Sequence, residues 1–194
     1  MMTDADPRTL YHRALDLSGA VLARVRTADL ARPTPCVGWD LRTLLGHVIG
    51  QNHGFARAVE TPDAPLAAFA ERPPDPGGVT EAWQASADRV AAAFDAAPLD
   101  RRVLLVELSS ETRFPLAMVV GFQLLDTVVH TWDVATALGE AFRPTDELVA
   151  AALAQARRVP GGSARQRPGA AFAPALPLDG TDDWSHTLAL LGRK

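Results

Sequence analysis

The chain is poor in cysteine and aromatic residues and has no excess of positive charge, and each of these features removes a class of protein. Its 194 residues include one cysteine, and Lys194 is the only lysine. A single cysteine excludes an internal disulfide framework and any zinc site built from several thiolates. The formal net charge of −4 gives no concentrated positive field, so we expect no nucleic-acid partner. An aromatic content of 6% disfavours extensive β-structure.

Long hydrophobic runs are missing as well. No uninterrupted apolar run reaches the roughly 18–20 residues that span a bilayer, so we expect no membrane partner. The first ten residues lack the apolar core of a signal peptide, which predicts a cytoplasmic protein. A length of 194 residues with 47% hydrophobic content suits one domain, residues 1–194, with its own core.

Helical periodicity dominates the rest of the sequence. It predicts four main helices, at about 7–28, 41–59, 79–97 and 115–139. Asp40 is the expected N-cap of the second helix and Gly139 the expected C-cap of the fourth. Proline-rich residues 61–78 predict a long crossover loop, and residues 102–114 predict a short β-hairpin. Shorter helices are expected at about 145–158 and 184–191, with irregular chain over 161–181. The fold class is therefore all-α, a four-helix bundle with a long crossover.

A stripe of polar residues runs along one face of the fourth predicted helix, which is otherwise apolar nearly all round. Its members follow one another at steps of 3, 4 and 3, and they are Gln123, Asp126, His130 and Asp133. At about 100° per residue they share one narrow face. No lysine, arginine or glutamate occurs between Leu116 and Leu138, so we expect this face to point inward rather than into solvent.

The stripe suggests a metal site. Asp126 and His130 stand one helical turn apart, so a carboxylate oxygen and an imidazole nitrogen can reach one ion. His47 on the second helix offers a third ligand, and its small neighbours (Thr43, Gly50, Gly54 and Ala58) leave room for a cavity or a close helix approach. Asp133 is expected to orient a ligand, but it could replace Asp126 as the acidic ligand. Zinc is the expected ion, with nickel as an alternative.

Two segments carry a family resemblance. Thr34–Gly50 (TPCVGWDLRTLLGHVIG) followed by Leu124–Gly139 (LLDTVVHTWDVATALG) resembles DinB-like metal-binding bundles of actinobacteria, and especially the N-terminal domain of mycothiol-dependent maleylpyruvate isomerase. The resemblance implies an antiparallel four-helix bundle with a divalent metal between helices. It maps the metal ligands onto His47, Asp126 and His130, although the isomerase pattern tends to have glutamate where this chain has Asp126.

Three functions are left open. The first is a zinc-dependent transferase or isomerase that uses mycothiol or a similar thiol as co-substrate and acts on a small molecule. The second is a non-catalytic module that binds a metal, a small ligand or a partner protein. In the third the site is vestigial, and Asp126 and His130 are only hydrogen-bonded. Cys36 is interpreted as a small buried residue rather than a nucleophile, and a homodimer is possible.

Overall fold

The structure, a computed structural model, describes residues 6–166, 172–178, 180 and 182–194. Part of the irregular stretch expected over residues 161–181 therefore lies outside the described residues. The chain divides into two compact units, Met1–Phe142 and Arg143–Lys194. That the whole chain is a single domain stays a prediction.

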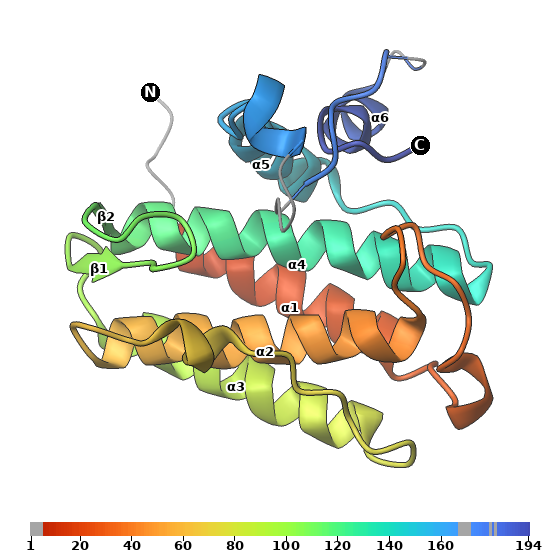
Figure 1. Ribbon diagram of the computed structural model, residues 1–194, viewed down its shortest axis with the longest axis horizontal. Helices are drawn as coiled ribbons and strands as arrows, with labels where there is room; N and C mark the ends of the chain where they lie inside the picture. Colours follow the sequence, from red (N-terminus) through yellow and green to blue (C-terminus); the bar gives the residue numbers. More distant parts are fainter. Residues whose placement is uncertain (1–5, 167–171, 179, 181) are drawn as a thin grey trace. The chain divides into compact units, whose positions relative to one another are not determined.

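The first unit is a four-helix bundle (Figure 1). Its helices are α1 (Pro7–Leu22), α2 (Leu41–Glu60), α3 (Val79–Ala96) and α4 (Leu116–Leu138). Helices α1 and α4 run in one direction and pack on each other, while α2 and α3 run in the opposite direction and also form a packed pair. This arrangement confirms the predicted all-α fold class.

The helix ends show how closely the predicted boundaries match. Asp40 caps α2 by accepting a hydrogen bond from the Thr43 N–H at 2.8 Å, and Gly139 ends α4 with a φ of 76°. Helix α1 is shorter than predicted, because it ends at Leu22 and is followed by a separate 3-10 turn, Thr27–Asp29. The buried Asp29 carboxylate accepts the Arg26 N–H at 3.0 Å, and this capping contact starts the new turn.

The predicted hairpin is present between α3 and α4. Strand β1 (Arg102–Leu104) pairs antiparallel with β2 (Arg113–Pro115). In the connection between them, the Ser109 hydroxyl accepts hydrogen bonds from the N–H groups of Glu111 and Thr112, at 3.2 and 2.9 Å. Side-chain acceptors of this kind stabilise tight turns, which explains why the chain reverses at this serine.

The crossover segment between α2 and α3 corrects one expectation. It contains a short 3-10 helix, Leu66–Phe69, and it runs directly along the glycine face of α2. A Cβ added at Gly50 would lie 2.4 Å from the carbonyl oxygen of Ala70, and one at Gly54 would lie 2.2 Å from the ring of Phe69. The crossover segment therefore packs closely against the small residues beside His47. We had expected a cavity or a neighbouring helix at this place.

A polar bridge crosses the apolar core of the bundle. Gln123 of α4 donates to the Asn52 side chain of α2 at 2.9 Å, and Asn52 donates to the Ser86 hydroxyl of α3 at 3.0 Å. All three side chains are buried. Buried polar groups favour the one arrangement in which they are paired, so this bridge fixes how three helices align.

The second unit contains α5 (Asp146–Ala156), a 3-10 turn (Gly162–Gln166) and α6 (Asp183–Leu190). Thr145 caps α5 and Asp182 caps α6 through their side-chain oxygens, and the two helices pack on each other. Both helices match the predicted ranges closely. Within the described parts of the chain, no helix is both long enough and apolar enough to cross a membrane.

Candidate metal centre

The polar stripe of α4 faces the interior of the bundle, as the absence of long charged residues predicted. Gln123, His130 and Asp133 are buried, and the Asp126 side chain keeps 21% of its surface exposed. A stripe with three buried members is not a solvated surface. The four side chains therefore need partners within the bundle.

Helices α2 and α4 bring the three predicted ligands together. His47 comes from α2, which contacts α4, and one ligand atom from each of His47, Asp126 and His130 lies within 4.8 Å of the other two. The His47 and His130 rings meet edge to face, with their centroids 5.1 Å apart. His47 and Asp126 are half-buried while His130 is buried, so the group borders solvent on one side.

The two nitrogens of His130 have different partners. Nε2 lies 3.4 Å from Asp126 Oδ1, and Nδ1 lies 2.8 Å from Asp133 Oδ2. An ionised carboxylate only accepts hydrogen bonds, so Nδ1 carries a proton and donates a hydrogen bond to Asp133. Nε2 is therefore the nitrogen that faces the predicted ligand group.

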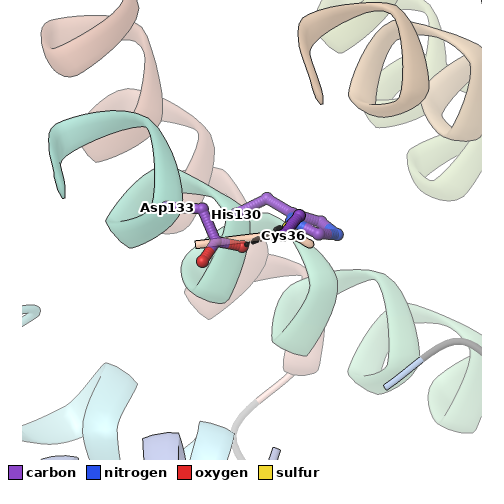
Figure 2. Close-up of side chains that lie close together, drawn as sticks. All are labelled: Cys36, His130 and Asp133. Atoms are coloured by element: carbon purple, nitrogen blue, oxygen red, sulfur yellow. Dashed lines mark hydrogen bonds and ion pairs between the residues drawn. The ribbon is translucent and has the colours of Figure 1, made fainter. Parts of the chain in front are cut away.

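Asp133 thus contacts the histidine on the edge away from Asp126. Its side chain is fully buried, and Oδ2 also accepts a hydrogen bond from the Cys36 thiol at 3.3 Å. Figure 2 shows Cys36 and His130 converging on this carboxylate. The sequence left open whether Asp133 replaces Asp126 as the acidic ligand, and this geometry favours the orienting role, which stays a prediction.

The electrostatics of the site centre on His130. Burial by itself lowers the pKa of this imidazole, but the charge of Asp126 and hydrogen bonds to Asp126, Asp133 and Cys36 together raise its pKa well above the usual value. The ring therefore holds a proton strongly when no metal is bound. A metal at Nε2 would compete with that proton for the same lone pair.

Three neighbours complete the surroundings. Trp39, just before α2, packs against His47 with ring centroids 4.9 Å apart. Gln51, one turn after His47, donates to Glu107 Oε1 at 3.2 Å, and the pKa of Glu107 is raised by partial burial and by the charge of Asp126. Sequence reasoning missed Glu107, because it lies in the connection between β1 and β2 and shares no spacing pattern with the ligand helices.

The chemistry of this donor set fits a divalent metal. Two imidazole nitrogens and one carboxylate oxygen are ligands that zinc takes at about 2.0–2.2 Å, and two such ligands of a tetrahedral ion lie roughly 3.3–3.6 Å apart. The 3.4 Å between His130 Nε2 and Asp126 Oδ1 matches that spacing. Three protein ligands would also leave a fourth position for a bound molecule, as in catalytic zinc sites.

The fold and this cluster together define the chain as a helical-bundle protein with a candidate divalent-metal centre between two helices. Comparison with known families is more specific, because the mycothiol maleylpyruvate isomerase N-terminal domain matches residues 11–135. The chain belongs to this family. The matched range contains all three candidate ligands, together with Cys36 and Asp133.

Individual relatives agree with the family assignment. The uncharacterized proteins Rv0738 and MT0763, from two strains of Mycobacterium tuberculosis, are each 34% identical to this chain over 89% of its length and 88% of theirs. Crystal structures of the mycothiol-dependent maleylpyruvate isomerase and of its histidine-to-alanine mutant match with TM-scores of 0.59 and 0.61 at 14% identity, over 77% of this chain. This likeness shows a shared fold, and this chain spans 66% of the isomerase's length.

Proposed function

We propose that the protein binds a divalent metal, zinc before nickel, through His47, Asp126 and His130, and that it uses the site in a thiol-dependent transfer or isomerisation. The convergence of these three donors, with the outer nitrogen of His130 bonded to Asp133, carries the proposal. Membership of the isomerase family supports the thiol, with mycothiol as the expected co-substrate and a small electrophilic molecule as the second substrate.

The chain's own residues have separable roles in this proposal. His47 and His130 supply neutral nitrogen donors, and Asp126 supplies negative charge that offsets part of the charge of the ion. Asp133 keeps the proton of His130 on Nδ1, so that Nε2 presents its lone pair to the metal. When bound, the metal supplies Lewis acidity that lowers the pKa of a coordinated thiol. Trp39 packs against His47 and limits the freedom of its ring.

Metal content is the decisive measurement. We expect near-stoichiometric zinc by elemental mass spectrometry in protein purified without a metal-affinity tag and without chelator. The His47→Ala/His130→Ala double variant should lose it. The matched control is His12→Ala, because His12 lies on α1 and pairs with Asp95 at 3.1 Å, outside the group. An empty wild type that takes up no added zinc would refute the metal site.

Turnover separates catalysis from binding alone. If zinc-loaded protein converts an electrophilic substrate only when mycothiol is present, and the double variant does not, the transferase or isomerase assignment holds. Net loss of the thiol indicates transfer, and its return indicates isomerisation. Stoichiometric zinc without thiol-dependent turnover would favour the second candidate, a non-catalytic metal- or ligand-binding module. Full metal loading of the His130→Ala variant would overturn the ligand assignment itself.

A further inference from the structure

Cys36 lies beside the metal site although it is 97 residues away from Asp133 in sequence. Its backbone is fixed on both sides, because the Cys36 N–H donates to the Thr34 hydroxyl at 3.1 Å and its carbonyl accepts from the Trp39 N–H at 3.0 Å. Arg32, in the same connection, donates to the last carbonyls of α4, those of Ala137 and Leu138. The thiol is therefore held at a defined place relative to α4.

One carboxylate oxygen links this thiol to the histidine. Asp133 Oδ2 accepts from Cys36 Sγ at 3.3 Å and from His130 Nδ1 at 2.8 Å, and the Asp133 side chain is completely buried. Two donors that converge on one oxygen restrict rotation of the carboxylate. An imidazole bonded to a restricted carboxylate is itself restricted, which keeps Nε2 aimed at Asp126 and His47.

We propose that Cys36 is a positioning residue of the metal site, which acts on His130 through the carboxylate of Asp133. The inference rests on the proposed function, because it concerns how tightly the three ligands hold their ion. It assigns Cys36 a function that goes beyond the small buried residue expected from the sequence. A thiol is a weak donor, so its effect on affinity should be smaller than that of Asp133 itself.

The test is the zinc dissociation constant of the full chain, measured by competition with a chelator. Removing a hydrogen-bond partner of a metal ligand typically weakens metal binding about 10–100-fold, which is the result expected for Asp133→Asn. For Cys36→Ala we expect a smaller loss, about 3–10-fold. Cys36→Ser should restore wild-type affinity to within about twofold, because the serine hydroxyl also donates.

A double variant tests whether Cys36 acts through Asp133. Cys36→Ala should cost less zinc affinity in the Asp133→Asn background than in the wild type, because the carboxylate that relays most of its effect is altered, while the direct interaction of the thiol with His130 remains. Val37→Ala is the matched control, since Val37 is the next residue in the same connection and is 97% exposed. Its zinc affinity should equal that of the wild type. Thermal unfolding of each metal-free variant shows whether an affinity loss reflects a damaged fold.

Three results would overturn the inference. Wild-type affinity in Cys36→Ala would show that the thiol does not position His130. Cys36, His130 and Asp133 also have ligand atoms within 4.8 Å of one another, so a sulfur-to-metal charge-transfer band in the cobalt-loaded wild type, lost in Cys36→Ala, would make Cys36 a ligand instead. A wild type that binds no zinc would refute the proposed function and this inference together, whereas the first result leaves the proposed metal site intact and the second keeps a metal site but changes its ligands.

Discussion

At the scale of single residues, His130 decides the chemistry of the site because its two nitrogens serve different purposes. Nδ1 is committed to Asp133 at 2.8 Å, and Nε2 faces Asp126 at 3.4 Å. A histidine with one nitrogen bonded to a buried carboxylate is the arrangement found around metal ligands, where the outer partner fixes the tautomer and the ring orientation. If the site were vestigial, with Asp126 and His130 only hydrogen-bonded to each other, neither His47 nor Asp133 would be needed beside them.

Substitution of Asp126 tests whether its charge or its length matters more. Asp126→Asn keeps the size of the side chain but removes its negative charge, so we expect zinc affinity to fall by at least about 100-fold. Asp126→Glu keeps the carboxylate and adds one methylene, for which the partly exposed side of the site leaves room. We expect its affinity to stay within about tenfold of the wild type. Isothermal titration with zinc measures both, and equal losses in the two variants would contradict this assignment.

The sequence predicted which side chains share one helix face better than it predicted what surrounds them. Spacing of 3 and 4 on one helix places Asp126, His130 and Asp133 on a common face, because helical geometry is local. The contact between Cys36 and Asp133 spans 97 residues and depends on how the α1–α2 connection lies on α4. The location of Glu107 near the site could not be predicted either, since no local pattern links a loop residue to a helix elsewhere in the chain. Such contacts follow only from the tertiary fold.

At the scale of elements, helix caps were predictable and the path of the crossover was not. Asp40 and Gly139 act within one turn of their own helices, so their types alone indicate the boundaries of α2 and α4. Proline content predicted that residues 61–78 form a loop, but not that the loop runs against the glycine face of α2. That path depends on contacts between Gly50 and Ala70, which lie in different elements.

Gly50→Ala should destabilise the bundle. The added methyl group would lie 2.4 Å from the Ala70 carbonyl oxygen, which belongs to backbone and cannot rotate away as a side chain does. Overpacking of this kind costs about 1–3 kcal/mol, against about 1 kcal/mol that alanine gains over glycine in a helix. Urea unfolding of the metal-free protein measures the net effect. Gly77→Ala is the control, because its Cβ would meet no atom within 4 Å, and equal stability of the two variants would contradict the close approach.

The contact between α2 and α3 at His53 predicts a pH-dependent stability. Arg89 Nη1 lies 3.2 Å from His53 Nδ1, so the neutral ring accepts its hydrogen bond. Burial and the positive charges of Arg72 and Arg89 lower the pKa of His53 in the folded state, while Glu60 opposes them. The unfolded chain then binds the proton more tightly. The resulting stabilisation is present above the unfolded pKa of about 6.5 and is lost as pH falls through the folded pKa.

His53→Gln should flatten this part of the stability profile, because glutamine accepts from Arg89 without titrating. We expect the wild type to lose more free energy of unfolding than the variant when pH falls from 8 to 5.5. The free energies of unfolding of the two proteins should be most similar at pH 8. Chemical denaturation of metal-free protein across this range measures both profiles. Parallel profiles would show that His53 does not contribute.

At the scale of the whole molecule, the sequence predicted the fold class but not the division of the chain. Four segments with helical periodicity and a long crossover indicate a bundle, because each helix has to bury its apolar surface against others. The compact units Met1–Phe142 and Arg143–Lys194 have no such local signal, since no clear linker composition separates them. All residues of the candidate metal centre lie in the first unit, so its geometry is set within the bundle.

The proposed metal should stabilise that bundle, because its ligands come from two different helices. An ion held by His47 of α2 and by Asp126 and His130 of α4 binds the folded chain far better than the unfolded chain, in which the three ligands are dispersed. At a free zinc concentration 100 times the dissociation constant, binding adds about 2.7 kcal/mol of stability. For a chain of this length that corresponds to a rise in Tm of roughly 5–11 °C.

Differential scanning calorimetry with graded zinc measures the shift in Tm. His130→Ala should show almost none, while His12→Ala should follow the wild type. A shift of equal size in all three proteins would mean that zinc stabilises the chain elsewhere, and the ion would then not link α2 to α4.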